Sequence, residues 1–302
     1  MLQITPEFKE NVIAALLNVR ENFDGSDSAF AKQYGIPGPV FSRLKNGERD
    51  GLIRDNQYLN IGRELNISIN NRKWNIARTA VLNIIEEDVN FCQSYSKAMI
   101  FVDECDIGKS TAAKYLSRTL KNCFYIDASE SKTRQLFIRS IAKRIGVDHN
   151  GKYAEVKANL KFYLKQLPQP IIIIDEAGDL EYPAFLELKE LWNATEGACG
   201  WYMIGADGLK EKIEKGIRNK KVGYREIFRR FSGNYQSAAP VDSREKIGFF
   251  QKLITEVLEA NVSDKTIIPK IVKQCIIKND GAPFAGLTRA ESFLILNTEY
   301  QN

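Results

Sequence analysis

Residues 107–111 carry the most specific chemical pattern in the chain. They read Ile-Gly-Lys-Ser-Thr, they follow the apolar stretch 98–102, and a helical pattern begins directly after them. A strand, a tight loop and Gly-Lys-Ser at a helix start are typical of the phosphate-binding loop of nucleotide hydrolases. Backbone N–H groups at the helix start bind phosphate, Lys109 adds a positive charge, and the Ser110 hydroxyl is a ligand for Mg²⁺.

The loop departs from the full pattern at its first position. The pattern requires glycine five residues before Gly108, and this chain has Asp103 there. We expect Asp103 to adopt the left-handed backbone that glycine favours, because aspartate tolerates it better than most residues. We expect the next two carboxylates, Glu104 and Asp106, to point outward. The residues predicted to bind the nucleotide are Asp103, Glu104, Cys105, Asp106, Ile107, Gly108, Lys109, Ser110 and Thr111.

A second pattern supplies the acidic groups that such a loop needs. Four isoleucines at 171–174 predict a buried central strand, and they end in Asp175 and Glu176. Asp175 would help to hold Mg²⁺, and Glu176 would act as the general base on the attacking water. The alternative is a core strand that ends in a solvent-exposed acidic pair. The Gly-Lys-Ser-Thr upstream favours the catalytic interpretation.

Together the two patterns resemble the Walker A and Walker B motifs of AAA+ ATPases, which implies ATP as the nucleotide. The resemblance assigns residues 201–209 to the next strand and its sensor-1 end, where Asp207 is a better candidate than Ala206. It also makes Arg289, in the carboxy-terminal helical part, a sensor-2 candidate that would reach the γ-phosphate. Three arginines stand where AAA+ proteins present an arginine finger to the neighbouring subunit, although a solvated basic helix face is the alternative: Arg225, Arg229 and Arg230.

Residues 28–48 have the layout of a helix–turn–helix. Phe30 and Phe41 fit the buried faces of two short helices, and Gly35 fits the turn between them. The stretch resembles the helix–turn–helix domains of phage repressors. Its outer side carries the residues predicted to contact DNA: Gly38, Ser42, Arg43 and Lys45. Acidic and basic residues are nearly balanced before residue 70, so a helical bundle that contacts only protein is the alternative.

A basic segment follows the sensor-1 region. Its cations could follow a DNA backbone without reading sequence, because that requires only positive charge. A solvated helix face is the equally weighted alternative. The residues are Lys210, Lys212, Lys215, Arg218, Lys220 and Lys221.

The elements that must position these residues alternate along the middle of the chain. Apolar runs at 99–102, 123–127, 171–175 and 201–205 alternate with amphipathic helical patterns, which predicts a parallel sheet with helical crossovers. A helical pattern also starts at Trp74 and continues to Ile85, and helices return after residue 240. We therefore predict an α/β P-loop fold with three layers. The predicted domains are a helix–turn–helix domain (1–70), an ATPase core (71–240) and a helical lid (241–302).

Composition excludes several classes of protein. The chain has 302 residues, 44% of them hydrophobic, and a formal charge of +5, which permits a nucleic-acid partner without demanding one. Five scattered cysteines predict reduced thiols in a cytoplasm, and a single histidine argues against histidine-based metal or catalytic sites. No apolar run is long enough for a membrane span, and the first residues lack the order of a secretory signal.

The combination of a small helix–turn–helix, one AAA+ module and a short lid resembles the family of phage Mu transposition protein B and related transposon helper ATPases. That resemblance implies ATP-dependent assembly on double-stranded DNA as a homo-oligomer, often a helical filament, together with target selection and activation of an integrase-like transposase. With aspartate in place of the loop glycine, we predict slow ATP hydrolysis that depends on oligomers. Two alternatives remain open: a non-hydrolysing transcriptional regulator with a P-loop sensor domain, and an ATPase of the helicase-loader type.

Overall fold

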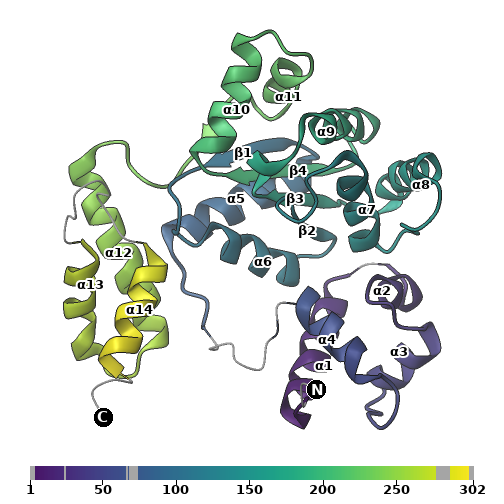
Figure 1. Ribbon diagram of the computed structural model, residues 1–302, viewed down its shortest axis with the longest axis horizontal. Coiled ribbons are helices and arrows are strands. Elements are labelled where there is room, and N and C mark those ends of the chain that lie inside the picture. Colours follow the sequence, from purple (N-terminus) through teal and green to yellow (C-terminus); the bar gives the residue numbers. More distant parts are fainter. Residues whose placement is uncertain (1–3, 24, 66, 68–73, 277–285, 299–302) are drawn as a thin grey trace.

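A parallel β-sheet of five strands lies at the centre of the molecule (Figure 1). The computed structural model describes residues 4–23, 25–65, 67, 74–276 and 286–298. The strand order is β2-β3-β4-β1-β5, and every pairing is parallel. The strands are β1 (Ala98–Val102), β2 (Cys123–Asp127), β3 (Ile171–Asp175), β4 (Gly200–Gly205) and β5 (Tyr235–Gln236). The predicted α/β sheet is confirmed, and only the short edge strand β5 was missed.

Helices cover both faces of this sheet. On one face lie α5 (Ala80–Tyr95) and α6 (Lys109–Thr119). The other face is covered by α7 (Arg134–Ile145), α9 (Tyr182–Ala194) and α10 (Asp207–Arg218), with α8 (Tyr153–Gln166) against α7 and α11 (Tyr224–Arg230) against α10. Ile171 and Ile173 pack with the first set, and Ile172 and Ile174 pack with the second. All four residues at 171–174 are apolar because both faces of β3 are buried.

Three carboxy-terminal helices form a lid with a hydrophobic cluster of its own (Figure 1). They are α12 (Ser243–Asn261), α13 (Ile268–Ile276) and α14 (Leu287–Thr298). Ile254, Leu258 and Ile271 are buried at the centre of its own hydrophobic cluster. The first lid helix also contacts the core, because Phe250 and Leu253 of α12 are buried in the cluster that α5 and α6 form with the sheet.

The segment before α5 belongs with this lid in space. Trp74 packs against the lid cluster, and its indole Nε1 donates to Glu291 Oε1 at 3.3 Å. The predicted helix is therefore wrong before residue 80, because the apolar surface of Trp74 is buried by the lid and not by a helix face. The helix α5 starts only at Ala80, where the Thr79 hydroxyl accepts a hydrogen bond from the Leu82 N–H at 3.2 Å.

Four amino-terminal helices pack against the β2 edge of the core. They are α1 (Pro6–Glu21), α2 (Asp27–Gln33), α3 (Gly38–Lys45) and α4 (Asp55–Glu64), and they share a continuous hydrophobic cluster with the core. Helices α2 and α3 form the predicted helix–turn–helix, with Phe30 and Phe41 fully buried between them. Gly35 has φ +63° in the turn, a backbone conformation that glycine adopts without strain. Among the described helices, none is long and apolar enough to cross a membrane.

Candidate nucleotide-binding site

The loop between β1 and α6 has the shape of an anion cradle. Ile107, which is 1% exposed, anchors the loop in the core, and α6 begins at Lys109 directly after Gly108. Gly108 has φ +90° and Asp106 has φ +62°, so these two residues provide the left-handed turns. Asp103 does not have a left-handed backbone. The expectation that aspartate replaces the loop glycine by adopting that conformation is therefore wrong. The first N–H groups of an α-helix have no partner within the helix, so the start of α6 can bind a phosphate.

The Lys109 side chain lies across the loop. It is only 8% exposed, and its ammonium donates to the Asp103 carbonyl at 2.9 Å and to the Glu104 carbonyl. Among the described residues, no carboxylate forms an ion pair with Lys109. Its positive charge can bind the phosphate oxygens of a nucleotide.

The acidic pair at the end of β3 lies beside that lysine. Asp175 is 2% exposed; its carboxylate accepts the Tyr125 hydroxyl at 2.9 Å and the Glu176 N–H at 3.0 Å. Burial and then the neighbouring Asp175 charge raise the pKa of Glu176, while the Lys109 charge lowers it. The structure therefore brings the two sequence motifs within electrostatic reach of each other. Glu176 has φ +49°, a strained backbone for a residue with a side chain, as is frequent at functional sites.

These donors fit a magnesium nucleotide. Mg²⁺ in nucleotide sites takes one or two protein oxygens and completes its coordination with phosphate and water. The Ser110 hydroxyl, on the first turn of α6, and the Asp175 carboxylate are oxygen donors of that kind. The Tyr125 hydroxyl fixes the orientation of the Asp175 carboxylate, the role that outer partners of metal ligands usually have. Nothing in the sequence pattern had singled out Tyr125.

The three acidic side chains of the loop all bind the lid side of the molecule. Asp103, 7% exposed, accepts the backbone N–H groups of Ala238 at 2.6 Å and Ala239 at 3.0 Å, where the chain leaves β5 for α12. Glu104 forms an ion pair with Lys246 of α12 at 2.5 Å. We call Asp103, Glu104 and Asp106 the acidic clasp. Its negative charges are thereby directed away from the phosphate cradle.

Asp106 completes the acidic clasp at the start of α14. Its carboxylate accepts the Thr288 N–H at 2.9 Å and the Thr288 hydroxyl at 2.6 Å. Glu104 and Asp106 are exposed and point away from the cradle as expected, and the structure adds that each also has a partner on the lid. Arg289, the predicted sensor-2 residue, follows Thr288 directly, so the structure places it near the loop. Its guanidinium stacks on Phe293, 5.3 Å from the ring centre.

The other predicted catalytic residues lie on α10 and α11. Asp207 is exposed at the first position of α10, immediately after β4. Arg225 and Arg229 are exposed on α11, as a residue that acts on a neighbouring subunit must be. Arg230 is less accessible, because its guanidinium lies 5.0 Å from the ring centre of Trp192 and its Nη1 is buried with no hydrogen-bond partner in the described part of the chain. Cys105 and Thr111 are exposed at the loop.

The helix–turn–helix presents its predicted DNA-contact residues on the surface. Ser42, Arg43 and Lys45 are exposed on α3, and Gly38 is half-buried at its start. Arg43 pairs with Glu48 at 2.7 Å, and Lys45 pairs with Asp27 of α2 at 3.1 Å. DNA phosphates would have to compete with these carboxylates, which limits the affinity that this helix alone can provide.

The basic side chains of α10 and of the residues just after it fall into two groups, those with a partner in the chain and those without one among the described residues. Lys212 is half-buried and its ammonium donates to the carbonyls of Gly178 at 2.6 Å and Leu180, just after the acidic pair. Lys212 is thus a structural residue, which argues against its predicted contact with DNA. Lys215 and Lys220 are exposed. The remaining cations have partners within the chain: Lys210 with Tyr235, Arg218 with Glu211, and Lys221 with Tyr182.

Comparisons with known proteins identify the core. Residues 92–213 match the family described as AAA domain, a segment that contains both sequence motifs. The structure is similar to a chain of the Orc1 protein from Aeropyrum pernix, solved in complex with DNA, with a TM-score of 0.54 and 15% identity over 76% of this chain. This chain spans 62% of the length of that one. No curated protein matches the sequence. The core is therefore an AAA-type P-loop domain, which implies nucleotide binding.

Proposed function

We propose that the chain is an ATP-dependent DNA-binding ATPase. The observation that carries the proposal is the proximity of Lys109, in the phosphate cradle, to Glu176 at the end of the all-isoleucine strand. A scaffold without catalysis has no need for a buried lysine, a buried aspartate and a strained glutamate in one place. The helix–turn–helix on the same chain supplies the DNA-binding part.

The residues have distinct roles in ATP hydrolysis. Lys109 and the N–H groups of α6 bind the β- and γ-phosphates, and Ser110 and Asp175 hold the Mg²⁺. The metal ion, when bound, neutralises charge on the phosphates. Glu176 positions the attacking water and accepts its proton, for which a raised pKa is an advantage near neutral pH. Hydrolysis also needs a positive charge from a neighbouring subunit, and the exposed Arg225 and Arg229 are our candidates.

Nucleotide and DNA binding would be coupled through the lid. The acidic clasp joins the phosphate loop to α12 and α14, so a phosphate that shifts the loop also shifts the lid. A shift of the lid would also move residues 74 and 75, because Trp74 and Asn75 are hydrogen-bonded to Glu291 and Asn261 of the lid. This coupling supports a switch in which ATP controls assembly of a homo-oligomer on double-stranded DNA.

The finer biological role that we propose is target selection in DNA transposition, with an integrase-like transposase as partner. It rests on the order of the parts in the chain, a helix–turn–helix before one AAA module and a short lid. A loader of the replicative-helicase type is the second candidate, favoured by the likeness to the DNA-bound Orc1 fold. Stimulation of ATPase activity by a purified transposase would favour the first role, and stimulation by a helicase would favour the second.

The decisive experiment measures ATP binding, ATP hydrolysis and DNA binding of three variants. Lys109→Ala should lose ATP binding and ATP-dependent DNA binding. Glu176→Gln should bind ATP and DNA but hydrolyse at least about 100-fold more slowly, because the general base is gone. Glu196→Gln changes an exposed carboxylate elsewhere and serves as the matched control. DNA binding and oligomer size that are the same with and without ATP would contradict the proposal.

A mixing experiment tests the arginines. Arg225→Ala and Arg229→Ala should each be assayed alone and mixed with Glu176→Gln. If one arginine acts on a neighbouring subunit, its variant is inactive alone but regains activity in the mixture, because some interfaces then combine an intact glutamate with an intact arginine. Full activity of both single variants would exclude Arg225 and Arg229 as the residues that act on a neighbouring subunit.

A further inference from the structure

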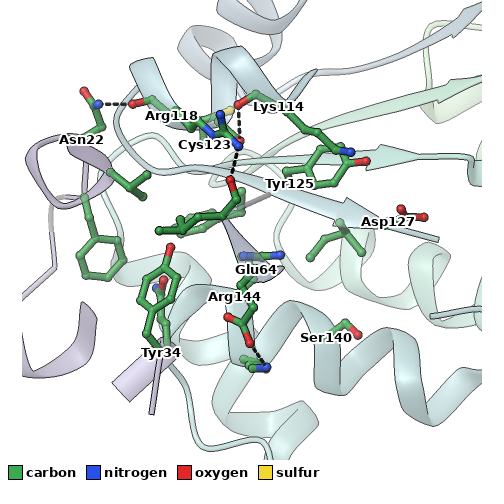
Figure 2. Close-up of a pocket in the computed structure, with 18 of the residues that line it drawn as sticks. Asn22, Tyr34, Glu64, Lys114, Arg118, Cys123, Tyr125, Asp127, Ser140 and Arg144 are labelled. Carbon is green, nitrogen blue, oxygen red and sulfur yellow. Dashed lines mark hydrogen bonds and ion pairs between the residues drawn. The ribbon is translucent and has the colours of Figure 1, made fainter. Parts of the chain in front are cut away.

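A cavity lies where the amino-terminal helices meet the β2 edge of the sheet (Figure 2). It has a volume of about 530 Å³, within the range of small-molecule sites. Its walls come from both parts of the molecule: α2 and α4 on one side, and α6, β2 and α7 on the other. A ligand here would contact the helix–turn–helix domain and the ATPase core at once.

One wall of the cavity contains a buried side-chain amide that lacks a hydrogen-bond acceptor. Gln33 is 6% exposed, and its side-chain Nε2 has no partner among the described residues. A buried amide N–H without an acceptor costs about 1–3 kcal/mol, so its presence calls for an acceptor that fills the space. Tyr34, 8% exposed and directly beside Gln33, adds a hydroxyl to the same wall.

Two guanidinium groups face the same space. Arg118 of α6 donates to the Leu65 carbonyl, and Arg144 of α7 lies against the Tyr34 hydroxyl. Neither arginine forms an ion pair within the described part of the chain. Burial lowers the pKa of Arg118, and the positive charge of Arg144 lowers it further. Two like charges held together in a half-buried cavity are stabilised when an anion enters between them.

The other charged residues that line the cavity do not cancel the positive charge of Arg118 and Arg144. Glu64 is engaged by Lys143 in an ion pair, and Asp127 accepts hydrogen bonds from the backbone and hydroxyl of Ser129. The other charged residues that line the cavity are Arg63, Lys114 and Glu130. The cavity thus carries more positive than negative charge, and it brings together the unpaired amide of Gln33 and two guanidinium groups, Arg118 and Arg144, that form no ion pair with the described residues.

We propose that this cavity binds a phosphorylated small molecule, distinct from the ATP at the P-loop. Phosphate is the common biological group that combines negative charge with several acceptor oxygens, which is what an unpaired amide and two arginines require. The cavity is large enough for a phosphate group and an organic part of nucleotide size. Binding would fasten the helix–turn–helix domain to the core.

The same ligand would lie close to the catalytic aspartate. Tyr125 lines the cavity with its ring, and its hydroxyl donates to the Asp175 carboxylate at 2.9 Å. A molecule that moves this ring would change the hydrogen bond that orients the Asp175 carboxylate. The cavity is therefore placed to adjust both the position of the DNA-binding domain and the magnesium site.

The test uses the full chain with Lys109→Ala and Ser110→Ala, which disable the P-loop, and measures binding by calorimetry with pyrophosphate and with AMP as probes. We expect saturable binding of at least one probe. Added Arg144→Gln should weaken it about tenfold or more, because a charge-assisted hydrogen bond is lost. Gln33→Leu removes the unpaired amide without opening a void and should weaken binding while the protein stays folded.

Lys32→Gln is the matched control, since Lys32 neighbours Gln33 in the chain but is exposed on the surface of α2. It should bind the probes as the parent does. The proposal is overturned if neither probe binds, or if Arg144→Gln and Gln33→Leu both bind as tightly as the control. Because the P-loop is already disabled, this outcome is independent of whether the chain hydrolyses ATP.

Discussion

Replacing Asp103 by glycine would restore the usual phosphate-loop pattern, yet the structure predicts that it loosens the lid. The Asp103 carboxylate accepts two backbone N–H groups, from Ala238 at 2.6 Å and Ala239 at 3.0 Å. Hydrogen bonds to a charged group contribute about 1.5–3 kcal/mol each, so two of them set an upper limit of about 3–6 kcal/mol. Both alanines are only partly buried, and water can replace part of the loss. We expect a net cost of about 2 kcal/mol.

The measurement is hydrogen exchange of the amides at 238 and 239 in the nucleotide-free protein. A loss of about 2 kcal/mol corresponds to exchange that is about 30-fold faster, since each 1.4 kcal/mol is a factor of about ten. Asp103→Asn should have an intermediate effect. Its single carboxamide oxygen can still accept from Ala238 and Ala239, but its NH₂ group would then face the Glu104 N–H, which now donates to Asp103 Oδ1 at 2.7 Å.

ATP binding should survive the change, because Gly108, Lys109 and Ser110 are untouched and one negative charge near the phosphates is removed. Glu196→Gln provides the control for loss of a carboxylate outside the loop, because that residue is exposed and lies in neither binding site. If Asp103→Gly exchanges at the wild-type rate at 238 and 239, the clasp does not hold the lid. Loss of ATP binding in the glycine variant would refute the separate conclusion that this carboxylate faces away from the cradle.

Three further predictions concern catalysis and DNA. Burial and the Asp175 charge raise the pKa of Glu176 above its ordinary value of 4.5. Because the base works only when it is ionised, a pH profile of kcat should show the ATPase rate falling at a higher pH than an unperturbed glutamate would give. A rate that is flat down to pH 4.5 would exclude Glu176 as the base. Tyr125→Phe removes the hydroxyl that orients Asp175, so half-maximal ATPase activity should require about 10-fold more Mg²⁺ in a metal titration; an unchanged Mg²⁺ requirement would show that the hydroxyl has no part in metal binding. Lys215→Ala should lower the slope of log affinity for double-stranded DNA against log salt by about 1. Lys212→Ala removes a side chain that is bonded within the core, so it should leave that slope unchanged. It should instead lower the free energy of unfolding by about 1–2 kcal/mol in denaturant unfolding. Equal slopes for the two lysine variants would argue that α10 does not contact DNA.

Local pattern was enough to predict the parts of the molecule whose residues act with near neighbours in the chain. The apolar run at 171–174, the Gly-Lys-Ser at a helix start, and the turn at Gly35 between two short helices each describe a segment of under ten residues. Side-chain periodicity and backbone preference operate at that range, and parallel strands joined by helices bring their carboxyl ends to one edge. The α/β fold, and the helix–turn–helix within it, therefore followed from the residues alone.

Tertiary structure decided where the charged side chains point. Asp103, Glu104 and Asp106 meet partners 135, 142 and 182 residues further along the chain, and no periodicity connects positions so far apart. For the same reason the sequence showed the missing glycine of the loop but not the partners of its acidic side chains on the lid. It likewise suggested a DNA contact at Lys212, whose ammonium instead binds carbonyls more than thirty residues earlier.

The sequence by itself determined the chemistry that this protein carries: a phosphate loop, an acidic pair after a buried strand, and a helix–turn–helix. Only the tertiary structure decided how those parts are joined, through the acidic clasp on the lid and the donor-lined cavity at the β2 edge. The physical reason is that hydrogen bonds and ion pairs select partners by position in space. Residue type fixes what a group can bind, but the packing of distant elements decides which group it meets.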